Sequence, residues 1–280
     1  MLIAQITDLH IVAAGKMFHS PRRAIPAADP TWSHIDTGAC LARAVATLNA
    51  LAPRPDVTVI TGDLTEHGSG EEYENLRTLL APLEMPVYMI LGNHDSREGL
   101  RRAFGGDGYL PADGFLHYAI DDHPVRIIAL DTHIPGAGGG ELCTERLAWL
   151  DRTLAAERDK PTIVIMHHPP FETAIEHMDH AGLSNPEAFA AIIRENPQVE
   201  RILCGHLHRT IDVRFAGTVA GTAPSAAHQL QMNLCPTAPA EFNFEPPGYQ
   251  LHLWRNGRLI THTAVIGDWP GPFPYRAPPG

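Results

Sequence analysis

The sequence predicts an α/β protein, because short apolar runs rich in β-branched residues alternate with amphipathic helices. The runs cover residues 2–6, 57–60, 87–91, 127–130, 162–166 and 201–204. Further along, apolar and polar residues alternate over 211–215, and runs at 249–254 and 258–265 are joined by Asn256-Gly257, a strong hairpin signal. We therefore expect the C-terminal third to supply a mixed sheet or a second sheet.

Helix-starting signals precede the amphipathic stretches that separate these runs. Leucine and valine recur at helical spacing between residues 41 and 51. Ser69 and Glu72 form a capping box for the next helix. Thr144 is expected to cap a third helix, and Asn185 followed by Pro186 predicts the N-cap and first turn of a fourth.

Length and composition are those of a globular protein. The 280 residues can hold one large domain or two small ones, and the formal charge of -11 argues against a broad nucleic-acid surface. Four scattered cysteines, Cys40, Cys143, Cys204 and Cys235, are expected to be reduced thiols rather than disulfides. Met1 leads straight into a strand, which argues against a signal peptide. No apolar stretch approaches the ~20 residues of a transmembrane helix. We expect a cytoplasmic protein with no membrane partner.

Metal-binding residue types directly follow five of the apolar runs. The five short sequences are Asp8-Leu9-His10, Gly62-Asp63, Gly92-Asn93-His94-Asp95, His167-His168 and Gly205-His206-Leu207-His208. In sheets that alternate with helices, ligands bind beyond the carboxyl ends of the strands. Five such motifs brought to one sheet edge predict a metal site.

The number and type of the candidate ligands indicate two metal ions. The candidates are Asp8, His10, Asp63, Asn93, His167, His206 and His208. Imidazole with carboxylate suits Fe, Zn, Mn or Co, whereas an all-oxygen set would suggest Mg or Ca. Seven ligands exceed what one ion takes while keeping an open position, so they suit two ions about 3.5–4 Å apart. Asp63 is the natural bridging ligand, since Asp8 is the only other carboxylate in the set.

The order and spacing of these motifs, with the run His167-His168-Pro169-Pro170, resemble the calcineurin-like metallophosphoesterase superfamily. Within it, the short chain and the His-His-Pro-Pro run look most like bacterial glycerophosphodiesterases and class III cyclic-nucleotide phosphodiesterases. The resemblance covers residues 8–208, roughly three quarters of the chain. It implies a four-layer αββα sandwich, a single domain over 1–280 with a C-terminal hairpin and a cap segment, and a family in which homo-oligomers are common.

The resemblance also implies how the site residues divide. Asp8, His10, Asp63 and His208 would hold one metal, and Asp63, Asn93, His167 and His206 the other. His94 and Asp95 would form the catalytic pair, with His94 facing the substrate and Asp95 orienting His94 or its loop. Asn93, His94 and His228 are the expected substrate contacts.

The implied reaction is hydrolysis of a small phosphodiester, either a glycerophosphodiester or a cyclic nucleotide, by attack of a metal-bridging hydroxide on phosphorus. His94 would stabilise charge on the phosphate or protonate the leaving alkoxide. The alternatives are a phosphomonoesterase or nuclease on the same site, or a catalytically silent metal-binding scaffold. The acidic composition argues against duplex nucleic acid as a partner.

Two long segments, residues 12–36 and 224–248, lack a regular pattern. Loops of this length are usually active-site lids or disordered stretches. Both leave the ligand-bearing edge or begin soon after it, so we expect a cap over the site. Arg22 and Arg23 could approach a phosphate there, although an exposed basic pair is more often only solvated.

Several residues near the motifs have a structural interpretation beside a functional one. His168 is expected to make hydrogen bonds around the site rather than bind metal, and Asp131 to make a structural hydrogen bond. Glu66 and His67 either line the pocket or cap the helix that follows.

A second cluster of potential ligands, His177, Asp179 and His180, lacks the spacing of the family's ligands. We expect these residues to belong to a lid rather than to a third metal site.

Overall fold

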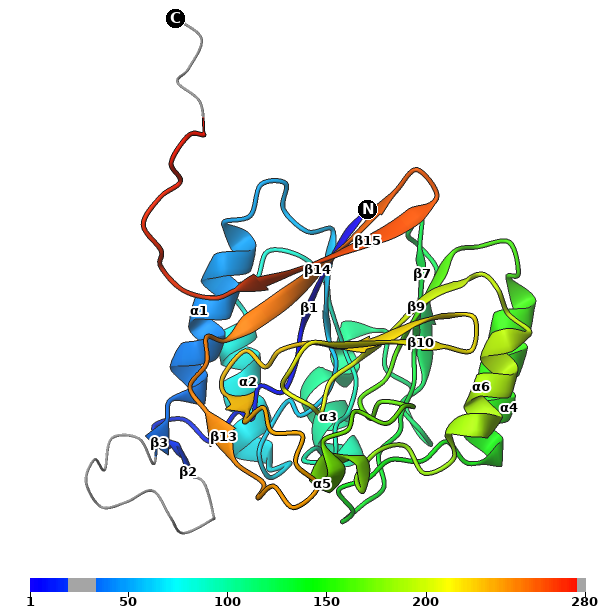
Figure 1. The fold of residues 1–280 in the computed structure, drawn as a ribbon, viewed down its shortest axis with the longest axis horizontal. Helices are drawn as coiled ribbons and strands as arrows, with labels where there is room; N and C mark the ends of the chain where they lie inside the picture. The colour runs from blue at the N-terminus through cyan, green and yellow to red at the C-terminus, as the bar shows by residue number, and fades with distance from the viewer. Residues whose placement is uncertain (20–33, 276–280) are drawn as a thin grey trace, which may run out of the picture.

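Two β-sheets lie face to face, and each is covered by helices on its outer side (Figure 1). The computed structural model describes residues 1–19 and 34–275. The first sheet is ordered β15 (Arg258–Val265), β14 (Gly248–Arg255), β1 (Leu2–Ile6), β4 (Val57–Ile60) and β5 (Val87–Met89). The second is ordered β10 (Ile211–Phe215), β11 (Thr218–Thr222), β9 (Val199–Cys204), β8 (Thr162–Ile165), β7 (Arg126–Ala129) and β6 (Tyr118–Ile120).

Helices cover the two outer faces. The first sheet carries α1 (Thr37–Asn49), α2 (Gly70–Leu80) and α3 (Arg97–Phe104), and the second carries α4 (Thr144–Ala156) and α6 (Pro186–Arg194). A short helix α5 (Glu176–Asp179) and a 3₁₀ turn η2 (Gly105–Asp107) complete the described helices. This arrangement confirms the four-layer αββα sandwich that the family resemblance implied.

Successive residues of the central strands pack in different layers. Val59 lies between the two sheets, whereas Ile60 packs under the helices of the first sheet. Ile163 and Val164 divide in the same way on the second sheet. Because side chains alternate along a strand and both faces are buried, the strands are largely apolar, which explains why they stand out in the sequence.

A buried layer of polar side chains crosses between the sheets. Gln5 of β1 donates from Nε2 to the carbonyl oxygen of Cys204 on β9, at 2.9 Å. Gln250 of β14 donates to the carbonyl oxygen of Thr222 on β11, at 3.3 Å. His252 of β14 contacts Gln5 Oε1 through Nε2, at 3.1 Å. The first two bonds fix the two sheets relative to each other close to the strand ends, and the third joins β14 to β1 within the first sheet.

The structure corrects several details of the predicted elements. Cys143 is the N-cap of α4, and Thr144, expected as the cap, is already its first helical residue. The C-terminal third extends both sheets rather than one, because β14 pairs with β1 while β11 pairs with β9. The short α3 and β6 were not predicted, since each offers too few apolar positions to show a period.

The two segments predicted as irregular contain short strands. Within 12–36, β2 (Phe18–His19) pairs with β3 (His34–Ile35), and within 224–248, β12 (Gln229–Leu230) pairs with β13 (Phe242–Asn243). Arg22 and Arg23 lie outside the described residues.

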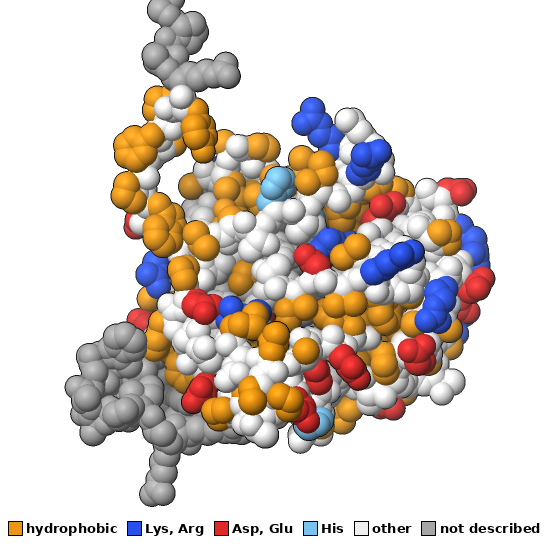
Figure 2. Space-filling model, viewed as in Figure 1, with side chains coloured by type: hydrophobic (Ala, Val, Ile, Leu, Met, Phe, Trp, Pro, Cys, Tyr) orange, Lys and Arg blue, Asp and Glu red, His pale blue; other side chains and the backbone are white. Residues whose placement is uncertain are grey.

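The end of the described chain runs away from the two sheets. Hydrophobic side chains gather along this tail (Figure 2). Trp269 and Phe273 on it expose 60% and 77% of their surface. None of the described helices is both long enough and apolar enough to cross a bilayer.

Candidate metal centre

The loops that follow β1 and β4 run side by side, held by a ladder of backbone hydrogen bonds. Asp8 N–H donates to the carbonyl oxygen of Gly62 at 3.1 Å, and His10 N–H donates to that of Asp63 at 3.0 Å. Further on, Ile11 and Thr65 form a parallel bridge. The backbone hydrogen bonds alone thus bring the first two predicted motifs together.

Five of the seven predicted ligands have a left-handed backbone conformation. They are Asp8, His10, Asp63, His206 and His208, with φ between 47° and 72°, out of eight non-glycine residues with positive φ in the described chain. For residues with a Cβ this conformation costs about 1–2 kcal/mol each, and such strain clusters at functional sites. The turns bend each side chain back toward a common centre directly after its strand.

Asp63 lies between two of the predicted metal-binding histidines. Its Oδ2 is 3.6 Å from His10 Nε2 and 3.4 Å from His167 Nε2. On one side, His10 Nε2 also faces His208 Nε2 at 3.1 Å, and His208 Nε2 lies 3.5 Å from Asp8 Oδ1. On the other side, His167 Nε2 faces Asn93 Oδ1 at 3.2 Å. The donor atoms therefore form two groups that meet at one carboxylate oxygen.

Three of these histidines are held through Nδ1, which leaves Nε2 directed at the centre. His167 Nδ1 donates to the carbonyl oxygen of Thr61 at 2.8 Å, and His208 Nδ1 donates to that of His228 at 2.8 Å. His10 Nδ1 instead lies 2.7 Å from Glu66 Oε2. A partner at the far nitrogen sets the tautomer in this way at most metal-binding histidines.

The site fits metal ions on two further observations. His206 Nε2 is buried and has no hydrogen-bond partner, which is rare for a buried polar atom. The clustered donors are carboxylate oxygens and imidazole nitrogens, with groups such as Asp8, His10 and His208 lying within 4.8 Å of one another. This mixture suits Fe, Zn, Mn or Co.

The electrostatics of the site depend on its buried carboxylates. Burial lowers the pKa of His10, but the hydrogen bond to Glu66 and the charge of Asp63 outweigh it and raise the pKa to about 9. Burial also lowers the pKa of His167, but the charge of Asp63 outweighs it and raises the pKa to about 9. Burial, with the charge on His167, lowers the pKa of His206 to about 3. The carboxylates thus attract positive charge to the centre.

His94 lies beside this centre and faces the solvent side. Its Nδ1 donates to the carbonyl oxygen of Glu66 at 2.9 Å, and its ring packs edge-on against His10 with centroids 4.8 Å apart. The side chain is 34% exposed.

Asp95 contacts the loops rather than the His94 ring. Its carboxylate accepts hydrogen bonds from the backbone N–H groups of Leu64, Thr65 and Gly92 and from the hydroxyl of Tyr73, at 2.8–3.1 Å. Gly92 must be glycine here, because a Cβ would overlap the Asp63 carboxylate. Asp95 therefore joins the second and third motifs, and sequence reasoning left open whether it would hold the loop or the histidine.

The centre forms the floor of a cavity of about 380 Å³. Floor residues lining it are His10, Asp63, Asn93, His94, His206 and His208. Its walls include Phe18 from the first long segment and His228, Leu230 and Phe242 from the second. We call the two segments, residues 12–36 and 224–248, the cap. His228 stacks on Phe18 at 5.0 Å and meets Phe242 edge-on at 5.3 Å. The sequence predicted the two cap segments and His228, but not the aromatic residues around it.

The other residues singled out in the sequence lie around the site. His168 contacts Thr132 Oγ1 at 2.7 Å and the carbonyl oxygen of Gly138 at 3.2 Å, so both ring nitrogens are engaged. Asp131 receives two hydrogen bonds from the guanidinium of Arg97, at 2.6 and 2.8 Å. Both arrangements support the structural interpretation of these residues.

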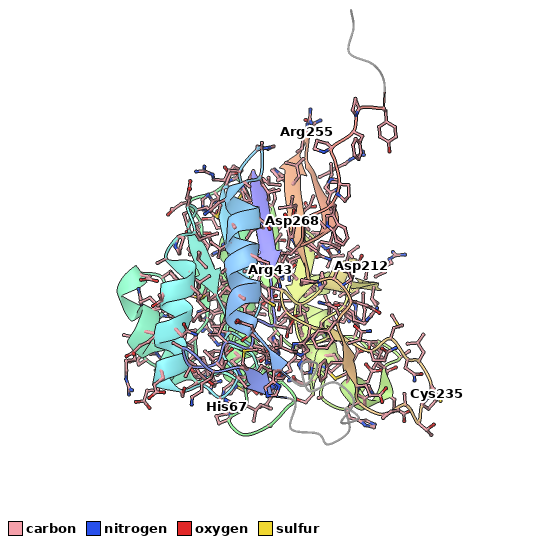
Figure 3. The ribbon with its side chains drawn as sticks, turned by 90° about the vertical axis from the view of Figure 1, so that its left-hand side faces the viewer. Arg43, His67, Asp212, Cys235, Arg255 and Asp268 are labelled. Carbon is pink, nitrogen blue, oxygen red and sulfur yellow. The ribbon has the colours of Figure 1, made fainter. Side chains whose placement is uncertain are left out.

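The remaining candidates divide between the cavity and its surroundings. Glu66 lines the cavity, whereas His67 bonds Glu72 and exposes 71% of its side chain at the end of the molecule where the ligand loops lie (Figure 3). In the second cluster of potential ligands, Asp179 accepts hydrogen bonds from Thr173. Its neighbour Met178 contributes to the cavity wall.

Fold and site together define an αββα sandwich protein with a candidate metal centre at the carboxyl ends of its strands. A sequence profile described as calcineurin-like phosphoesterase matches residues 1–210. The chain therefore belongs to the calcineurin-like phosphoesterase family, in which a divalent metal centre is expected.

Individual relatives cover nearly the whole chain. A probable glycerophosphodiester phosphodiesterase from Arcobacter nitrofigilis is 36% identical over 277 residues, 98% of this chain and 97% of the relative. A probable cyclic nucleotide phosphodiesterase from Rhodopseudomonas palustris is 32% identical over 94% of this chain and 91% of its own length. A dimetal phosphatase from Danio rerio has the same fold, with a TM-score of 0.63, 15% identity, and coverage of 95% of this chain and 99% of that one.

Proposed function

We propose that this protein is a phosphodiesterase that hydrolyses small phosphodiesters at a centre of two metal ions. The observation that carries the proposal is the convergence of seven donor side chains from five strand ends on one centre, with five of the seven lining the cavity above it. The relatives described as a glycerophosphodiester phosphodiesterase and a cyclic nucleotide phosphodiesterase support the same reaction class.

The two groups of donors support one ion on each side of Asp63. We assign Asp8, His10, Asp63 and His208 to one ion, and Asp63, Asn93, His167 and His206 to the other, with Fe, Mn, Zn or Co as the candidate metals. Bound cations supply Lewis acidity, activating water as the nucleophile and neutralising charge on the phosphate oxygens.

His94 is the residue that would move a proton. Because Nδ1 donates to the carbonyl oxygen of Glu66, the edge that carries Nε2 faces the cavity. A protonated His94 can donate from Nε2 to a phosphate oxygen, which stabilises its charge, or to the leaving alkoxide, which is otherwise hard to expel at neutral pH.

The cavity supports a diester rather than a monoester substrate. Among its described lining residues there is no lysine or arginine, while Glu66 and Glu241 add negative charge. A diester carries one negative charge and a monoester close to two near neutral pH, so the monoester would need more cationic contacts than these walls offer. A volume of about 380 Å³ suits a small ligand rather than duplex nucleic acid.

The cap completes the proposal. We infer one domain over 1–280, in which the described parts of segments 12–36 and 224–248 cover the floor and select the groups attached to the phosphate. Phe18, Leu230 and Phe242 give the walls an apolar surface for those groups.

The test is hydrolysis of bis(p-nitrophenyl) phosphate against p-nitrophenyl phosphate by protein reconstituted with Mn²⁺ and by chelator-treated protein. We expect metal-dependent turnover that favours the diester. A preference for the monoester would reassign the protein as a phosphatase. Two bound metals with no turnover of either ester, or of a panel of natural diesters, would indicate a metal-binding scaffold.

A further inference from the structure

Glu66 follows Asp63 by three residues and is held against the loop that carries His10. Its backbone N–H donates to the carbonyl oxygen of Ile11 at 3.1 Å, next to the Ile11–Thr65 bridge. The ladder between the two loops therefore delivers the Glu66 side chain to the far side of the His10 ring. The side chain is 13% exposed, and Glu66 lines the cavity.

The side chain and the backbone of Glu66 hold two different histidines. The carboxylate Oε2 lies 2.7 Å from His10 Nδ1, and the carbonyl oxygen accepts a hydrogen bond from His94 Nδ1 at 2.9 Å. The same Oε2 is 3.5 Å from His94 Nδ1. Glu66 thus contacts the Nδ1 atoms of two histidines, the proposed metal ligand His10 and the proposed proton donor His94.

A proton on Nδ1 fixes the tautomer in which Nε2 carries the lone pair. For His10 this lone pair points to the space shared with His208 Nε2, 3.1 Å away, and with Asp63 Oδ2, 3.6 Å away. A histidine can bind a metal only through an unprotonated nitrogen, and a carboxylate at the other nitrogen also makes the ring a stronger ligand.

His10 differs from the other two histidines that are held through Nδ1. The acceptors for His167 and His208 are backbone carbonyl oxygens, which no substitution removes. The acceptor for His10 is a side chain. Metal affinity on the His10 side of the centre should therefore depend on the residue at position 66.

We propose that Glu66 is a positioning residue, which orients His10 for the metal through its carboxylate and His94 for the substrate through its carbonyl oxygen. The proposal rests on the function proposed above. It assigns to Glu66 no direct contact with metal or with the reacting phosphate.

The experiment compares the wild type with Glu66→Ala, Glu66→Gln and His67→Ala. His67 is the matched control, because it is the next residue in the same loop and its exposed side chain bonds Glu72 rather than the site. Mn²⁺ affinity and stoichiometry are measured by titration of chelator-treated protein, alongside kcat and KM for bis(p-nitrophenyl) phosphate. Thermal unfolding checks that each variant is folded.

Removing such a partner of a metal-binding histidine typically weakens metal binding about 10- to 100-fold, and we expect this loss for Glu66→Ala. The amide oxygen of Glu66→Gln can still accept a hydrogen bond from His10 Nδ1, so this variant should keep most of the Mn²⁺ affinity. His67→Ala should match the wild type. Saturating Mn²⁺ should restore much of kcat to Glu66→Ala, because the backbone still holds His94. It should not restore kcat to His94→Ala.

Three outcomes would overturn the proposal. One is wild-type Mn²⁺ affinity in folded Glu66→Ala. Another is a loss in Glu66→Gln as large as that in Glu66→Ala. The third is a stoichiometry of three in the wild type that falls to two in Glu66→Ala, which would make Glu66 a metal ligand. If the wild type binds Mn²⁺ but hydrolyses no ester, the proposed function fails while the affinity comparison still decides the role of Glu66.

Discussion

The floor and the cap of the cavity are built in opposite ways. On the floor, Asp8, Asp63 and His167 expose at most 2% of their surface, and their backbones are fixed at the ends of central strands. The described part of the cap consists of loops and two-residue strands, and Met232 and Leu234 on it expose 46% and 58%. Folding of the two sheets therefore determines the position of the floor, whereas the described part of the cap has little regular structure. We infer that the floor supplies the chemistry and the cap selects the substrate.

The rigidity of the floor has two sources. The loops after β1 and β4 are joined by backbone hydrogen bonds, and the Asp95 carboxylate joins the loops after β4 and β5. The two sheets are joined three residues before Asp8 and two before His206, by the bond from Gln5 to the carbonyl oxygen of Cys204. Donors on different sheets can then converge despite strained backbones, because neither loop can relax independently.

The largest effect is expected for Asp63→Ala, which tests whether Asp63 joins the two halves of the metal centre. Since Asp63 Oδ2 faces both His10 and His167, its loss should disrupt both halves of the centre and abolish turnover of the diester. Metal analysis of the purified variant should find fewer than the two ions per chain expected of a dinuclear site. A variant that holds both ions normally would disprove the bridging role.

The second prediction separates proton transfer from metal binding. His94→Ala should reduce kcat about 10²–10⁴-fold, the usual contribution of a positioned acid or base, with little change in metal content. His67→Ala, in a neighbouring loop, should leave both quantities unchanged. Equal losses of metal and turnover in His94→Ala would show that the residue supports the metal centre instead.

The third prediction concerns the polar layer beneath the floor. Burial lowers the pKa of His252 to about 3, below its ordinary value of 6.5. A histidine with a lowered folded-state pKa stabilises the fold fully above pH 6.5, and this stability is lost as the pH falls toward 3. The free energy of unfolding should therefore drop between pH 6.5 and 4, and His252→Gln should reduce this slope. An unchanged slope in the variant would exclude His252 as the cause.

The smallest effect is expected in the cap. Phe242→Ala removes an aromatic wall whose contacts are worth ~0.5–1.5 kcal/mol, so KM should rise at most about tenfold while kcat and metal content stay near the wild type. Leu234→Ala is the matched control, an exposed residue of the same segment that does not line the cavity. A collapse of kcat or metal content in Phe242→Ala would mean that the cap is part of the catalytic floor.

The same contrast explains what the sequence could predict. The floor residues could be predicted from the sequence, because each donor follows a buried strand and strand ends are visible as the ends of apolar runs. The cap could be predicted only as two long segments, since the positions of Phe18 and Phe242 depend on contacts between distant loops. The inter-sheet layer was missed, because Gln5 and His252 lie in strands where polar residues would ordinarily face solvent.

Backbone strain was also invisible to sequence reasoning. Asp8, Asp63 and His206 are not residues whose type alone requires a positive φ, and their conformation depends on the loops that surround them. The role of Glu66 was left open for a similar reason: only the ladder to Ile11 decides that its carboxylate reaches His10.

The most direct test of the account is a titration of Mn²⁺ into chelator-treated protein, with bound metal and hydrolysis of bis(p-nitrophenyl) phosphate followed in the same samples. We predict that turnover develops as the second ion binds and reaches its maximum at two ions per chain, both in the wild type and in Phe242→Ala. Full turnover at one ion, or turnover that does not depend on metal, would contradict a dinuclear floor as the source of the chemistry.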